Sequence, residues 1–333
     1  MPTVLICPEA YYQTTAPYVE LFQQAGFEIR YPDDRTFTRG LLGDEATIAQ
    51  MAGVDATIAG GEYYTPQVIE ALPQLKVIAR AGVGFDRVDV AAASAAKIAV
   101  TVTPTTNHES VAELTLALLF GVTKRIVVND RAVRAGEWPT DLLLPIRGQT
   151  FGIIGLGRIG RSTAVRAQAL GMQVLACEKF PQQDFVDQHG IELVDFEQLL
   201  QRSDIVSIHC PLNDETRGMM NGDAFTAMKP RAILLNTARG GVVVEADLVE
   251  ALRNGTIHAA GLDVFEVEPT SADNPLFQMD NVVVSPHKAG TDEKSSEGMG
   301  VEAAECIIKL CSGEWPEGAV VNDELRDGWS WQR

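Results

Sequence analysis

Residues 151–178, FGIIGLGRIGRSTAVRAQALGMQVLACE, decide how this chain folds. The apolar run FGII predicts a buried strand, and the glycines Gly155, Gly157 and Gly160 follow it directly. A helix-competent run follows, with Gly171 as its C-cap, and QVLACE predicts the next strand. Strand, glycine turn, helix and strand in this order predict a parallel βαβ unit.

The glycine spacing in this unit is the G-x-G-x-x-G pattern of dinucleotide-binding folds. Gly155 permits a tight turn, Gly157 lets the backbone approach a pyrophosphate, and Gly160 lets the helix pack closely on the sheet. The pattern alone is weak evidence, because glycine turns also occur in loops without ligands. Glu178 ends the second strand near the spacing of about 20 residues expected of a ribose-binding carboxylate, although a solvated strand-end glutamate is the alternative. The glycine pattern and Glu178 together predict NAD rather than NADP. The neighbouring cation Lys179 weakens the exclusion of NADP.

Strands and helices alternate on both sides of this unit. Before it, TVLICP, FEIR, DATIAG, KVIARAG and AVTVT predict strands, with helices near 44–51 and 89–96. After it, IELV, DIVSIH, AILLN, HAAGLD and NVVVSP continue the series. This alternation predicts an α/β chain with two doubly wound parallel sheets. Two long helix-competent stretches, 109–136 and 292–311, are interpreted either as packing helices or as struts between domains.

Bulk properties limit the class of protein. A chain of 333 residues with 46% hydrophobic and 22% charged residues predicts two soluble domains. Five scattered cysteines, never spaced C-x-x-C, predict a reducing compartment and no metal site. The apolar stretch at the N-terminus is too short for the core of a signal peptide, and the sequence has no apolar run long enough to span a membrane. We therefore expect a cytoplasmic protein. A formal charge of −18 argues against nucleic-acid and membrane partners.

Three polar residues follow apparent strands in the second half of the chain. Arg239 lies in AILLNTARGG, Glu268 in AAGLDVFEVEP and His287 in VVVSPHKAG. His287 can exchange a hydroxyl proton, Glu268 can orient the imidazole and stabilise its protonated form, and Arg239 can grip a carboxylate. Each alone has a plainer explanation, namely a surface ion pair, a solvated carboxylate or a helix-capping histidine. Behind a dinucleotide fingerprint, the set predicts alcohol–ketone interconversion with a nicotinamide.

The motifs GLGRIG, HCPL, NTARGG, GLDVFEVEP and SPHKAG, together with the strand-end acid, occur in one order. With them the chain closely resembles the D-isomer-specific 2-hydroxyacid dehydrogenases, over about residues 3–322. The resemblance implies a Rossmann NAD domain, residues 104–288, inserted in a flavodoxin-like substrate domain, residues 1–103 and 289–333, with the active site in the cleft. It implies an NAD-dependent enzyme that interconverts a D-2-hydroxy acid and its 2-keto acid, typically as a homodimer through the NAD domain.

The resemblance also implies roles for single residues. Arg239, Glu268 and His287 correspond to the catalytic positions. The substrate would be bound by the backbone amides of Val83 and Gly84, by Asn107 and by Arg239. The positions that correspond to the family's cofactor contacts are Gly155, Gly157, Arg158, Ile159, Gly160, Glu178, His209, Pro211, Thr237, Ala238, Asp263, His287 and Gly290.

One departure from the family bears on the substrate. Phosphoglycerate enzymes commonly supply an arginine after the third N-terminal strand, whereas this chain has Gly60, Gly61 and Glu62. A carboxylate near an incoming phosphate is unfavourable, so we expect a small unphosphorylated 2-keto acid. Two alternatives stay open: an NAD-sensing scaffold or co-repressor-like binding protein on the same fold, and a related formate or phosphite dehydrogenase.

Overall fold

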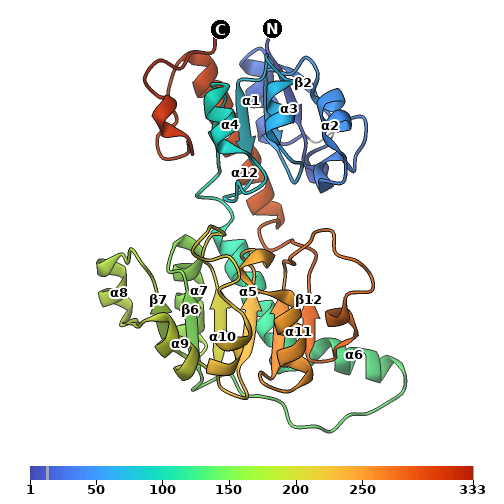
Figure 1. Cartoon of the computed structure of the whole chain (residues 1–333), viewed down its shortest axis with the longest axis vertical. Coiled ribbons are helices and arrows are strands. Elements are labelled where there is room, and N and C mark those ends of the chain that lie inside the picture. The colour runs from blue at the N-terminus through green and yellow to red at the C-terminus, as the bar shows by residue number, and fades with distance from the viewer. Residues whose placement is uncertain (13–14, 333) are drawn as a thin grey trace. The chain divides into compact units, whose positions relative to one another are not determined.

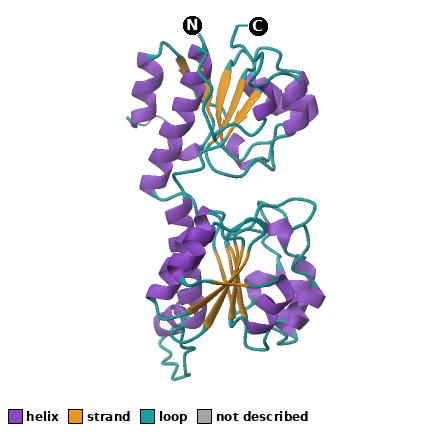
Figure 2. Cartoon of the chain, turned by 90° about the vertical axis from the view of Figure 1, so that its left-hand side faces the viewer, coloured by secondary structure: helices purple, strands orange, loops and turns teal. Residues whose placement is uncertain are grey.

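The computed structural model describes residues 1–12 and 15–332. The chain divides into two compact units. Unit 1 comprises Met1–Asn107 and Thr291–Arg333, and unit 2 comprises His108–Gly290. In each unit, helices cover both faces of a parallel sheet (Figures 1 and 2). Unit 2 is therefore an insertion in the sequence of unit 1.

Unit 1 contains a five-stranded sheet in the order β2-β1-β3-β4-β5. Its strands are β1 (Thr3–Ile6), β2 (Glu28–Arg30), β3 (Ala56–Ala59), β4 (Val77–Arg80) and β5 (Ala99–Thr101). Successive side chains of β1 enter different cores, with Val4 and Ile6 on one face and Leu5 on the other. Both faces are thus buried, as a parallel sheet requires. The strand order is the flavodoxin-like one, which confirms the prediction for this part of the chain.

The C-terminal segment completes unit 1. The helices of this unit are α1 (Pro17–Gln24), α2 (Asp44–Met51), α3 (Pro66–Glu70), α4 (Val90–Ala95) and α12 (Glu293–Ser312). Helix α12 packs on α1 so closely that a Cβ atom at Gly300 would lie 2.4 Å from the Tyr18 ring. Ala303, Ala304 and Ile307 of α12 belong to the same core as β1 and β3.

Unit 2 contains a seven-stranded parallel sheet in the order β12-β11-β10-β9-β6-β7-β8. Its strands are β6 (Thr150–Ile154), β7 (Gln173–Cys177), β8 (Glu192–Leu193), β9 (Ile205–Ile208), β10 (Ile233–Asn236), β11 (Ala259–Leu262) and β12 (Val282–Val284). Counted from β6, this is the Rossmann order with one additional edge strand, which confirms the predicted second doubly wound parallel sheet. The order reverses between β6 and β9, so the glycine turn after β6 lies at the switch point where such sheets bind ligands.

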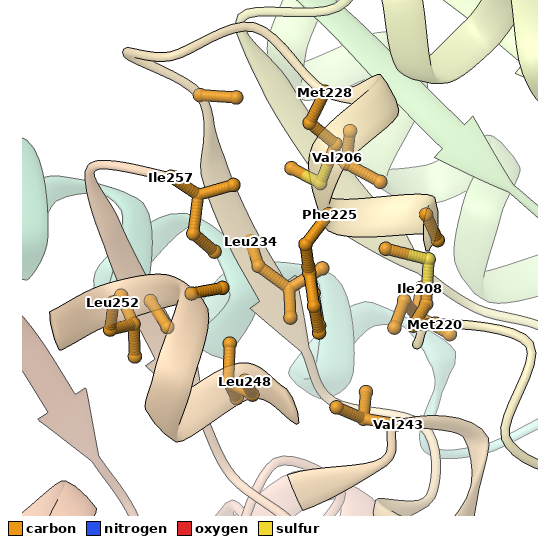
Figure 3. Close-up of a cluster of buried hydrophobic side chains, with 14 of the residues drawn as sticks. Val206, Ile208, Met220, Phe225, Met228, Leu234, Val243, Leu248, Leu252 and Ile257 are labelled. Atoms are coloured by element: carbon orange, nitrogen blue, oxygen red, sulfur yellow. The ribbon is translucent and has the colours of Figure 1, made fainter. Parts of the chain in front are cut away.

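Helices pack on both faces of this second sheet. They are α5 (His108–Thr123), α6 (Ile126–Arg134), α7 (Arg158–Ala169), α8 (Gln183–His189), α9 (Phe196–Arg202), α10 (Gly222–Ala227) and α11 (Glu245–Arg253). Figure 3 shows part of one core, in which Phe225 of α10 and Leu248 of α11 lie close to Leu234 of β10. All three side chains are almost fully buried. Such a core fixes the carboxyl ends of β9 to β11, where the candidate site residues lie.

The helix-competent stretch 109–136 forms two helices. Helix α5 ends at Thr123, and Arg125 adopts a left-handed conformation with φ +50° before α6 begins. Arginine is a good helix former, so the sequence pattern gives no signal for this break. More than half of the α5 residues are buried, whereas none of the α6 residues is.

Two further observations concern the described residues as a whole. Among them, every helix is too short or too polar to cross a membrane. Within the same residues, no three histidine, cysteine or acidic side chains are grouped to hold a metal ion.

Candidate active site

The glycine turn after β6 is closed at two glycines and open at the third. A Cβ atom at Gly155, which has φ +94°, would lie 2.7 Å from the Cys210 nitrogen. One at Gly160 would lie 2.1 Å from the Gly155 carbonyl oxygen. At Gly157 no described atom other than those of Gly157 and its two chain neighbours lies within 4 Å of that position. The turn therefore leaves the start of α7 accessible to a phosphate group, which its N–H groups and helix dipole favour. Arg158 and Ile159 are the first residues of this helix.

Glu178 lies directly beyond β7 and is held by two backbone amides. Its Oε2 accepts a hydrogen bond from the Leu156 nitrogen at 2.6 Å, and its Oε1 accepts one from the Phe180 nitrogen at 2.9 Å. The first bond ties the carboxylate to the glycine turn. Each oxygen has a second acceptor site, so the carboxylate can still bind ribose hydroxyl groups.

His209 and Pro211 follow β9, on the other side of β6. The His209 Nε2 atom lies 2.9 Å from Ser207 Oγ, in a hydrogen bond whose direction depends on the tautomer. Burial lowers the pKa of His209 to about 3, so its ring is uncharged near neutral pH. Together with the Cys210 backbone against Gly155, these residues form an uncharged wall beside the glycine turn.

Asp263 has a structural task that sequence reasoning missed. It is fully buried beyond β11, and its Oδ1 and Oδ2 accept hydrogen bonds from the backbone nitrogens of Lys288 and Ala289 at 2.9 and 2.8 Å. Its carbonyl oxygen accepts a hydrogen bond from the His287 nitrogen at 2.7 Å. Asp263 thus fastens the loop that carries His287 and leads to Gly290. The partners are more than 20 residues away, so no local pattern in the sequence indicates this role.

His287 and Glu268 form a hydrogen-bonded pair. His287 Nδ1 lies 2.6 Å from Glu268 Oε2, and Glu268 Oε1 accepts a hydrogen bond from the Phe265 nitrogen at 3.0 Å. His287 has φ +53°, an uncommon conformation for a non-glycine residue, and its side chain is 44% exposed. With Nδ1 engaged, Nε2 is the ring nitrogen left for a ligand.

Arg239 lies beyond β10, and its loop contacts the loop that carries Glu268. The Arg239 carbonyl oxygen accepts a hydrogen bond from Asn236 Nδ2 at 2.9 Å. The Nη1 atom of the Arg239 side chain donates one to the Ala238 carbonyl oxygen at 2.7 Å. A Cβ atom at the next residue, Gly240, would lie 1.9 Å from the Phe265 oxygen. The loops after β10, β11 and β12 are therefore joined, and they bring Arg239, Glu268 and His287 to one edge of the sheet. Thr237, in the first of these loops, shares a hydrogen bond with Thr115 at 2.9 Å.

Val83, Gly84 and Asn107 belong to unit 1. Val83 and Gly84 lie in the loop after β4, where Arg80 Nε donates a hydrogen bond to the Gly84 oxygen at 3.1 Å. The Gly82 nitrogen donates to Thr103 Oγ1 at 2.8 Å, so the loop is held at both ends. Asn107 is the last residue before unit 2 and is 7% exposed.

The expectation for Glu62 is wrong. Glu62 is 1% exposed, and its carboxylate accepts hydrogen bonds from the Gly60 nitrogen and from the Tyr64 hydroxyl, the latter at 2.8 Å. The carboxylate is buried within the turn and bonded there, so it is not the exposed group that was expected beside an incoming phosphate. Beside the turn, the Arg87 guanidinium donates a hydrogen bond to the Gly61 oxygen.

The sequence and the fold match proteins of known class. Residues 116–289 match the family model described as D-isomer specific 2-hydroxyacid dehydrogenase, NAD binding domain. A D-3-phosphoglycerate dehydrogenase of Archaeoglobus fulgidus is 43% identical over 74% of this chain, but the match spans only 47% of that relative's length. A glyoxylate reductase of Korarchaeum cryptofilum is 41% identical over 78% of this chain and 80% of its own. The fold is similar to the crystal structure of D-lactate dehydrogenase from Aquifex aeolicus complexed with NAD and lactic acid, with a TM-score of 0.83. The two sequences are 27% identical, and the match covers 96% of this chain and 98% of that chain.

Proposed function

The chain belongs to the D-isomer-specific 2-hydroxyacid dehydrogenase family, and from this premise we propose that it interconverts a D-2-hydroxy acid and its 2-keto acid with NAD. Residues 116–289 match the family's model of the NAD-binding domain. The observation that carries the proposal is the hydrogen bond of 2.6 Å between His287 and Glu268. Both residues lie on loops that are joined to the loop that carries Arg239.

These three residues can perform the proton chemistry of keto reduction. His287 donates a proton from Nε2 to the keto oxygen, while the Glu268 carboxylate stabilises the imidazolium through Nδ1. Arg239 binds the substrate carboxylate with its planar guanidinium and polarises the adjacent carbonyl group. A bound nicotinamide would supply the hydride that adds to the carbonyl carbon. The carbonyl group thus becomes a hydroxyl group, and His287 is left neutral.

The glycine turn and the residues around it fit the cofactor. The open position at Gly157 and the start of α7 suit the pyrophosphate, and Glu178 suits the adenosine ribose. The proposed cofactor contacts are Gly155, Gly157, Arg158, Ile159, Gly160, Glu178, His209, Pro211, Thr237, Ala238, Asp263, His287 and Gly290. In the same proposal, Val83, Gly84, Asn107 and Arg239 bind the substrate.

We propose small unphosphorylated 2-keto acids as substrates. A side chain does not fit at Gly60, where a Cβ atom would lie 1.9 Å from Thr38 Oγ1, so this turn offers no cation of its own. Arg87 is engaged with the Gly61 oxygen and lies over the Tyr63 ring at 4.9 Å. Val83, beside the proposed carboxylate-binding amides, presents an exposed apolar side chain.

A panel of substrates tests both the reaction and its range. With NADH, kcat/KM should be higher for glyoxylate, hydroxypyruvate or pyruvate than for 3-phosphohydroxypyruvate. If 3-phosphohydroxypyruvate is the best substrate, another cation such as Arg87 binds the phosphate. If no 2-keto acid is reduced although NADH binds, the NAD-sensing alternative replaces the enzyme proposal.

We also propose a homodimer through unit 2. Helix α6 and the loop that follows it expose large apolar side chains, among them Ile126, Val133, Trp138 and Leu142. Figure 1 shows this loop, in green, running along the rim of unit 2 between α6 and β6. Trp138 is 82% and Leu142 98% exposed, which is costly unless a partner covers them.

A further inference from the structure

An exposed ion pair bridges the two loops that flank the glycine turn. Lys179 follows β7, and its Nζ donates hydrogen bonds to Oε1 and Oε2 of Glu215 at 2.9 and 3.0 Å. Glu215 lies in the loop that follows β9. Because β7 and β9 are the two neighbours of β6 in the sheet, the pair spans the carboxyl end of β6, next to the glycine turn.

The loop that carries Glu215 is internally fixed. The Asn213 Oδ1 atom accepts hydrogen bonds from the backbone nitrogens of Glu215 and Thr216 at 3.0 and 3.1 Å. The Thr216 hydroxyl donates to the Pro211 oxygen at 2.6 Å. Glu178, on the opposite loop, is held by two amides of its own. The acceptor for the Lys179 ammonium group is therefore preformed.

We propose that Glu215 is a cofactor-specificity residue, which holds the Lys179 ammonium away from the 2′-position of the adenosine ribose. The inference rests on the proposed function, which puts that ribose at Glu178. Lys179 is the neighbour of Glu178 in sequence and would otherwise be a cation available to a 2′-phosphate. While Lys179 is paired with both oxygens of Glu215, a phosphate must compete for it. The pair with Glu215 therefore favours NAD over NADP through Lys179.

A double-mutant cycle on the full chain tests this coupling. The dissociation constants of NADH and NADPH are measured by nicotinamide fluorescence for the unmutated protein, Glu215→Gln, Lys179→Met and the double variant. Glu215→Gln should strengthen NADPH binding relative to NADH by about two- to fivefold, the size of one exposed charge interaction. The gain should shrink at high salt and should be absent in the Lys179→Met background.

Glu192→Gln is the matched control. Glu192 forms a similar exposed, bidentate pair with Arg202 in unit 2, at 2.7 and 2.8 Å, and its substitution changes the net charge equally. It should leave the ratio of the two dissociation constants unchanged. An unchanged ratio in Glu215→Gln, or a gain that persists without Lys179, overturns the inference while normal NADH binding leaves the proposed function standing. Failure of the unmutated protein to bind NADH would overturn both.

Discussion

At the scale of single residues, His287 is the most direct test of the proposed chemistry. We predict that His287→Ala lowers the turnover of keto reduction by roughly 10²–10⁴-fold, because the keto oxygen loses its proton donor. NADH affinity should fall far less than turnover, since His287 is only one of the proposed cofactor contacts and the glycine turn and Glu178 are untouched. Steady-state kinetics and fluorescence titration measure the two effects. His258→Ala, an exposed histidine of the same unit, is the control. Near-normal turnover in the His287 variant would remove the proposed mechanism.

His209 predicts a pH dependence of stability. Its folded pKa of about 3 lies below the ordinary value of about 6.5, so the folded state resists protonation of the ring. Its contribution to the free energy of unfolding is complete above about pH 6.5 and decreases as the pH falls toward 3, by at most about 1.4 kcal/mol per pH unit. Urea unfolding at pH 7.5 and 5.0 should therefore show a smaller loss on acidification for His209→Gln than for the unmutated protein. Equal losses would contradict the burial of this imidazole.

At the scale of elements, two glycines of the glycine turn have different roles: one is needed for stability and the other for cofactor binding. Gly160→Ala should destabilise unit 2, because its new methyl group would overlap the Gly155 carbonyl oxygen and push α7 from the sheet. Gly157→Ala should leave the unfolding midpoint nearly unchanged, since that position faces open space, but should weaken NADH binding. Thermal unfolding and NADH titration of the two variants distinguish these effects. The prediction is wrong if both variants lose stability equally.

Elements of the fold were predictable where the signal is local. The strands, the glycine turn and the strand-end positions of Arg239, Glu268 and His287 follow from apolar runs and from the rule that ligands bind at carboxyl ends of parallel strands. Contacts between distant segments were not. Asp263 bonds to the His287 loop across 25 residues, and the burial of Glu62 depends on tertiary packing, so neither leaves a periodic pattern in the sequence.

At the scale of the whole molecule, helix α6 and the loop that follows it, together called the apolar arm, predict the oligomeric state. If α6 and the loop after it form the dimer interface, replacing Trp138 and Leu142 by serine should shift the protein toward monomer. Light scattering coupled to size-exclusion chromatography measures the mass. The paired control replaces Leu41 and Phe277, exposed apolar residues outside this arm, and should keep the mass of the unmutated protein. A monomeric unmutated protein would contradict the proposal.

The discontinuity of unit 1 has a consequence for synthesis on the ribosome. Its first segment, ending at Asn107, leaves the exit tunnel before unit 2 but lacks α12, whose Ala303, Ala304 and Ile307 fill one of its cores. Unit 2, by contrast, is continuous in sequence and has its whole core once Gly290 emerges. The inserted unit is thus the first that can complete its fold, while the nascent N-terminal segment keeps an uncovered apolar face. Until translation reaches α12, we expect that face to expose apolar surface of the kind that chaperones bind.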